Sequence, residues 1–113
     1  MTRELNKINL VIVASEFNSK VVIELLNSVK EACNSYDGIK ENLKIYKVPG
    51  AFEIPGMVNC LMKNSKPDIV ITLGSIIRGE TTHYDHVAEN CSYAISQLSL
   101  NYDIPIIFGV LCT

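Results

Sequence analysis

The chain has 113 residues, of which 48% are hydrophobic and 19% charged, so we expect one folded domain and not a disordered protein. Its 10 Lys and Arg residues against 12 Asp and Glu residues leave no broad basic surface, which argues against a nucleic-acid partner. No apolar run is long enough to cross a membrane, and residues 1–7 do not resemble a signal peptide, so we expect a cytoplasmic protein.

The first predicted elements are a buried strand and an amphipathic helix. Residues 8–14 are short, β-branched and almost wholly apolar, which is typical of a strand covered on both faces. After a polar break, apolar residues recur at helical spacing over residues 21–33, and Asn18 or Ser19 can cap this helix. Residues 36–38 are expected to end it.

A second strand and helix follow. The strand candidate covers residues 43–48, and residues 49–53 are predicted to form a turn. Pro55 suits the first turn of a helix, because its missing N–H would have no partner there. The apolar residues of this helix recur at i, i+3, i+4, i+7 and i+8, and they are Ile54, Met57, Val58, Leu61 and Met62.

The last predicted elements are a strand at residues 69–73, a loop at 74–81, a helix capped by Thr82 with Asp85, and a strand at 105–111. Strands that alternate with helices pair in parallel through right-handed crossovers. We therefore predict one domain over residues 1–113, an α/β three-layer sandwich with a central four-stranded parallel sheet, flavodoxin-like. Its functional edge should be the carboxyl end of the strands.

The chain ends at the tip of the apolar fourth strand, where a further helix would be expected to cover the other face. We expect either that a C-terminal segment is absent from this chain or that another subunit covers this face.

The potential metal ligands do not suggest a metal site. The four cysteines, Cys33, Cys60, Cys91 and Cys112, are too far apart for a C-x-x-C pair, so we predict reduced, mostly buried thiols. His83 and His86 are spaced i, i+3, but no third ligand is evident, and we expect no metal.

Three loops should meet at the carboxyl edge of the sheet: residues 16–18, 49–53 and 74–83. In the third loop, Glu80 and Thr81 lie where a helix begins, so backbone N–H groups there can bind a phosphate. His83 follows them and can transfer protons near neutral pH.

Each of these residues also has a simpler interpretation. Thr81 and Thr82 can be helix caps without any role in phosphate binding, and His83 can be an ordinary surface residue. Phe17 and Phe52 can be apolar plugs of the core.

Taken together, the motifs resemble the lumazine synthase family. Residues 48–55 match its V-P-G-A-F-E-[IL]-P signature, and residues 74–85 resemble its G-x-[VI]-I-[RK]-G-x-T-x-H-[YF]-[DE] loop. Phe17 and Asn18 fit the aromatic–Asn pair after the first strand, and residues 105–111 resemble the fourth strand. The similarity runs in order from residue 8 to residue 113.

The resemblance implies a transferase that joins 5-amino-6-(D-ribitylamino)uracil to 3,4-dihydroxy-2-butanone 4-phosphate. The products would be 6,7-dimethyl-8-ribityllumazine and phosphate, in the penultimate step of riboflavin biosynthesis, without a metal or redox cofactor. It also implies a homopentamer, in some members a 60-subunit icosahedral shell, and riboflavin synthase as a further partner. The family continues beyond the fourth strand with helices that carry a phosphate-binding basic residue, and we expect this chain to lack that segment.

The resemblance also assigns roles to individual positions. His83 would transfer protons, while Glu80 and Thr81 would hold the substrate phosphate. Phe17 would stack on the pyrimidine, and Phe108 would reach a neighbouring subunit's site. The other positions implied for pyrimidine and ribityl binding are Ala51, Phe52, Glu53, Ser75, Ile76 and Ile77.

Two other functions remain open. The first is a flavodoxin-like ligand-binding module, whose first loop should contain glycine, whereas residues 15–19 contain none. The second is an assembly or shell protein with impaired catalysis, against which an intact Phe17, Glu53 and His83 argue.

Overall fold

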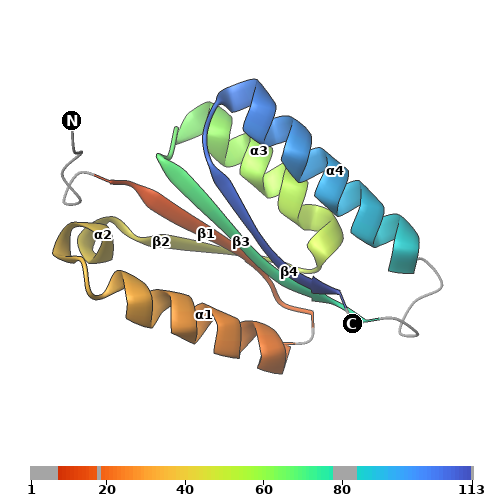
Figure 1. The fold of residues 1–113 in the computed structure, drawn as a ribbon, viewed down its shortest axis with the longest axis horizontal. Helices are drawn as coiled ribbons and strands as arrows, with labels where there is room; N and C mark the ends of the chain where they lie inside the picture. Colours follow the sequence, from red (N-terminus) through yellow and green to blue (C-terminus); the bar gives the residue numbers. More distant parts are fainter. Residues whose placement is uncertain (1–7, 18, 78–83, 113) are drawn as a thin grey trace.

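The structure is a computed structural model that describes residues 8–17, 19–77 and 84–112. Its strands run parallel in the order β2-β1-β3-β4, with α1 and α2 on one face and α3 and α4 on the other (Figure 1). This arrangement confirms the predicted three-layer α/β fold and its four-stranded parallel sheet. The elements are β1 (Leu10–Ser15), α1 (Ser19–Cys33), α2 (Asp37–Asn42), β2 (Lys44–Val48), the 3-10 turn η2 (Ala51–Glu53), α3 (Ile54–Asn64), β3 (Ile69–Ile76), α4 (Tyr84–Tyr102) and β4 (Ile106–Cys112).

The central strand β1 is buried along its whole length, as its apolar sequence predicts. Val11 and Val13 belong to the core cluster under α3 and α4, whereas Ile12 belongs to the cluster under α1. Ile12 lies between Ile45 of β2 and Ile71 of β3 in the sheet register. The alternation follows from the two-residue period of a strand, so helices on both faces require apolar residues at nearly every position.

The structure differs from the predicted elements in two segments. Residues 36–38 do not simply end a helix, because α2 follows, and its Ile39 is buried in the cluster under α1. β3 continues to Ile76, although a loop was predicted from Gly74. Gly74 and Ser75 pair with Val110 and Leu111 of β4. This pairing with a strand that is distant in the sequence extends β3 beyond its predicted end.

The starts of α1 and α3 lie within the described residues. Pro55 lies in the first turn of α3, as predicted, and the described α1 begins at Ser19. The predicted caps at Asn18 and Thr82 lie outside the described residues.

The edge strand β4 is covered less completely than β1. Val110 is buried toward the α3–α4 layer, whereas Ile107 and Leu111, which alternate with it, are 55% and 42% exposed. Phe108 is 40% exposed. Much of the apolar surface of β4 is therefore exposed to solvent in the single chain.

The cysteines differ partly from their predicted environment. All four are free, but only Cys33 and Cys91 are buried, while Cys60 and Cys112 are exposed. Cys60 lies outside the apolar stripe of α3, and Cys112 lies at the end of the edge strand β4. The described residues contain no group of three or more His, Cys, Asp or Glu side chains that could hold a metal ion. None of the helices in the described ranges is long and apolar enough to cross a membrane.

Candidate functional site

The first two loops meet at the carboxyl edge of the sheet through backbone hydrogen bonds. The N–H of Glu16 donates to the carbonyl of Val48 at 2.8 Å, and the N–H of Phe17 donates to the carbonyl of Pro49 at 3.0 Å. These bonds continue the β1–β2 pairing beyond the last strand residues. They hold Phe17 beside the turn that follows β2.

A cavity of about 190 Å³ lies where these loops meet the end of β3 and the start of α4. It brings together most of the predicted pyrimidine-binding positions, which come from segments distant in sequence. Gly50 and Val87 also belong to its walls, although the sequence analysis did not name them as binding residues. The lining consists of Phe17, Gly50, Ala51, Phe52, Ser75, Ile76, Ile77 and Val87.

The walls of this cavity are mainly apolar, with two aromatic rings near the solvent. Phe17 is 45% exposed and Phe52 is 59% exposed, whereas Ala51 and Ile76 are buried. Exposed aromatic rings next to a cavity can stack on a planar ligand, which removes apolar surface of both from water. The cavity is therefore suited to a flat heterocycle.

The turn after β2 is held from two sides. The N–H of Glu53 donates to the carbonyl of Gly50 at 3.1 Å, within the 3-10 turn. The carbonyl of Ala51 accepts the N–H of Ile54 and also the thiol of Cys91 from α4, at 3.4 Å. The turn that carries Ala51 and Phe52 is thus tied to both α3 and α4.

The floor below the turn is tightly packed. Ser15 is 2% exposed, and its hydroxyl has no hydrogen-bond partner among the described residues. A β-carbon added at Gly74 would lie 3.0 Å from that hydroxyl and 3.2 Å from Cδ1 of Ile54. A residue larger than glycine at position 74 would therefore require Ser15 or Ile54 to shift by a few tenths of an ångström.

Not every predicted site residue lines the cavity. Glu53 is exposed, and its carboxylate lies beside Gly50. Phe108 lies on β4, paired with Thr72, and does not border the cavity of its own chain. The predicted phosphate-binding residues Glu80 and Thr81 and the predicted proton-transfer residue His83 lie outside the described residues.

Val87 was missed as a binding residue because it fits the apolar stripe of α4. Apolar residues recur at helical spacing over residues 84–98, and this spacing indicates burial without separating core positions from cavity walls. Val87 does pack against the core, but it also borders the cavity from the first turns of the helix. Its position soon after the 74–83 loop is the signal that could have identified it.

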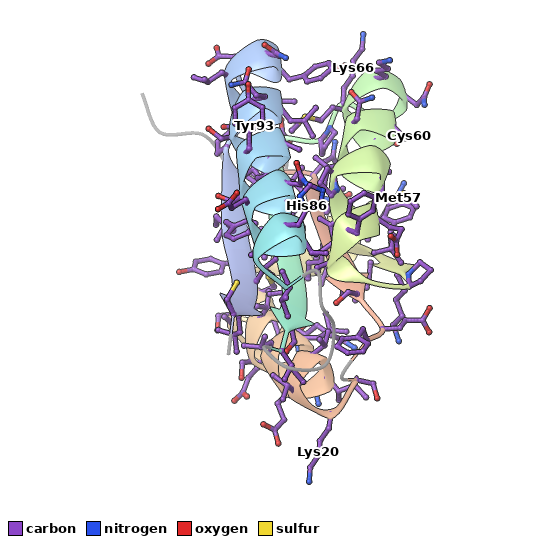
Figure 2. The ribbon with its side chains drawn as sticks, turned by 90° about the vertical axis from the view of Figure 1, so that its right-hand side faces the viewer. Lys20, Met57, Cys60, Lys66, His86 and Tyr93 are labelled. Carbon is purple, nitrogen blue, oxygen red and sulfur yellow. The ribbon has the colours of Figure 1, made fainter. Side chains whose placement is uncertain are left out.

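His86 lies on the outer side of the α3–α4 pair. Figure 2 shows the two helices side by side, with His86 and Tyr93 on α4 and Met57 and Cys60 on α3. His86 borders a separate surface cavity of about 340 Å³, together with Pro55 and Tyr93.

A model of one protein family matches residues 7–113, and the family is described as 6,7-dimethyl-8-ribityllumazine synthase. The matched range contains all four strands and each of the loops at the carboxyl edge.

Proposed function

The chain belongs to the 6,7-dimethyl-8-ribityllumazine synthase family, and from this premise we propose that it condenses 5-amino-6-(D-ribitylamino)uracil with 3,4-dihydroxy-2-butanone 4-phosphate. The products are 6,7-dimethyl-8-ribityllumazine and phosphate, in the penultimate step of riboflavin biosynthesis. The cavity of about 190 Å³ supports this proposal, because two loops, the end of β3 and the start of α4 converge on it, with two exposed aromatic rings. A cytoplasmic location stays a prediction.

The pyrimidine is proposed to bind in this cavity. Phe17 stacks on its ring, since a 45% exposed phenyl group gains contact area from a planar partner. The ribityl chain lies along Ala51, Phe52 and Glu53, with Ser75, Ile76 and Ile77 on the opposite side. Backbone groups of these two segments can satisfy the ribityl hydroxyls, which the mainly apolar side chains cannot.

The second substrate is proposed to bind next to the pyrimidine, with its phosphate at Glu80 and Thr81. The pyrimidine amine attacks the ketone to give a Schiff base with loss of water, phosphate leaves, and the ring closes with loss of a second water. Holding both substrates together supplies much of the rate. His83 transfers protons in these steps and contributes a further factor of roughly 10² to 10⁴.

The active site is proposed to lie between subunits of a homopentamer. Phe108 is 40% exposed and Ile107 is 55% exposed on the edge strand, an apolar surface that association would bury. In this arrangement Phe108 of one subunit closes the pyrimidine site of the next. A 60-subunit shell and a complex with riboflavin synthase are the larger assemblies that belong to the same proposal.

The activity is tested by incubating the protein with both substrates and recording the absorbance of the lumazine product. We expect product only when both substrates are present. Pyrimidine binding without turnover would indicate a ligand-binding module or an impaired shell protein, and it would refute the catalytic proposal.

Phe108→Asp tests the shared site. We expect the variant to lose assembly and activity together, because a carboxylate buried at an apolar contact is strongly disfavoured. Light scattering at low concentration gives the mass, and lumazine absorbance gives the activity. A fully active wild-type species at the monomer mass of 12.5 kDa would contradict the proposal.

A further inference from the structure

We propose that Cys91 is a positioning residue for the pyrimidine cavity, acting through a hydrogen bond from its thiol to the backbone of the Ala51–Glu53 turn. Cys91 does not line this cavity, and the sequence predicted it only as a reduced, buried thiol. The inference rests on the proposed function for the identity of the ligand. It adds a residue that sets the separation between two walls of the site.

The contact joins two residues that are 40 positions apart. Sγ of Cys91 lies 3.4 Å from the carbonyl oxygen of Ala51, and the two residues are 1% and 5% exposed. A thiol is a weak donor, but in a buried location water does not compete for the same carbonyl. The Ala51 carbonyl therefore accepts one bond from α3, through the N–H of Ile54, and one from α4.

One end of this bond, Ala51, lines the cavity, and the other end lies on α4, the helix that supplies another lining residue. Ala51 and Phe52 line the cavity from the turn, and Val87 lines it from α4. Val87 precedes Cys91 by four residues, so both lie on the same face of the helix. A shift of the turn away from Cys91 would widen the gap between Phe52 and Val87.

The thiol remains a donor at physiological pH. Burial, together with a smaller effect of the nearby Cys112, raises the pKa of Cys91 to about 11. The folded protein therefore keeps the S–H group that the bond requires. A thiolate could only accept hydrogen bonds and would repel the carbonyl oxygen.

Cys91 also belongs to the buried core, so a packing role must be separated from a positioning role. Serine and alanine make this separation, because they have nearly the same volume and differ by a hydroxyl donor. Both substitutions remove the sulfur and leave a similar void. Only Cys91→Ser retains a group that can donate to Ala51.

The test compares wild type, Cys91→Ala and Cys91→Ser by steady-state kinetics and by amide hydrogen exchange at Glu53 and Ile54. In Cys91→Ala we expect the KM for the pyrimidine and the exchange rates to rise roughly two- to fivefold, as for loss of one weak hydrogen bond. The kcat should change less than KM, because no reacting group is removed. In Cys91→Ser both values should return toward those of wild type.

Cys33→Ala is the matched control. Cys33 is also a buried helical thiol, but it is the last residue of α1, on the other face of the sheet. We expect its truncation to leave the KM and the exchange of the turn unchanged.

Equal impairment of Cys91→Ala and Cys91→Ser would overturn the inference, because loss of packing alone would then explain the impairment. An unchanged KM and unchanged exchange rates in Cys91→Ala would also overturn it. If Cys91→Ala does not fold, Cys91→Val and Cys91→Thr provide the same comparison at larger volume. If wild type forms no lumazine, the proposed function fails, but hydrogen exchange still decides whether Cys91 holds the turn.

Discussion

The carboxyl end of β1 lies between two cavities, one against α1 and one against the Ala51–Glu53 turn and α4. The α1 cavity is about 350 Å³ and is bordered by polar groups that include Glu16, Ser19 and Lys47. The turn cavity is about 190 Å³ and has Phe17 and Phe52 near its opening. Water solvates charged and hydroxyl groups well, but it gains little from a phenyl ring. The smaller cavity is thus the better candidate for a flat organic ligand, because its apolar, aromatic lining matters more for binding such a ligand than a larger volume does.

The largest expected effect concerns His83, which directly precedes α4 in the sequence. His83→Ala should lower kcat by roughly 10² to 10⁴ through loss of proton transfer, while pyrimidine affinity changes little. Steady-state kinetics and calorimetry measure the two quantities separately. An unaltered kcat, or activity that a chelator abolishes, would contradict this role.

The core below the turn cavity should be far more sensitive to truncation than the wall of the α1 cavity. Ile54 is 0% exposed and packs over Gly74, so Ile54→Ala should reduce the free energy of unfolding by about 2–5 kcal/mol. Ile23, which borders the α1 cavity, is 49% exposed, and Ile23→Ala should change the free energy of unfolding by about 0.5 kcal/mol or less. Urea denaturation measures both, and equal losses would mean that the two sides of the sheet are equally packed.

Ligand binding should separate the two cavities directly. Phe17→Ala should weaken pyrimidine binding by roughly 1–3 kcal/mol, the range observed for aromatic–base stacking. Lys47→Ala, which alters the α1 cavity, should leave that affinity unchanged. Calorimetric titration of both variants decides the point, and the opposite pattern would place the ligand against α1.

The smallest expected effect concerns the buried hydroxyl of Ser15 between the cavities. Because it has no partner among the described residues, Ser15→Ala should raise the free energy of unfolding slightly, by about 1 kcal/mol or less. Thr72→Val is the control, since the Thr72 hydroxyl donates to the Ile107 carbonyl at 3.1 Å and its loss should destabilise by about 0.5–1.5 kcal/mol. A destabilised Ser15→Ala would show that its hydroxyl has a partner in solution.

The sequence predicted the parts of this protein that depend on local pattern. The buried strand β1 and the stripe of α3 follow directly from their periods, and Phe17, Ala51 and Phe52 were placed at the site by their motifs. The extension of β3 to Ile76 was not predictable in the same way, because it depends on pairing with β4. Likewise, Val87 and Cys91 have the same apolar spacing as core residues, and only the tertiary position of the turn gives them a different role.

The close packing around Gly74 links the residue types that positions 15 and 74 can hold. The side chain of Ser15 occupies the space that a β-carbon at position 74 would enter, and Ile54 closes it from above. A side chain at position 74 fits only if Ser15 or Ile54 gives way, so the residue at position 15 affects which residues are acceptable at position 74. Among related chains, a residue larger than glycine at position 74 should therefore occur together with a small residue at position 15.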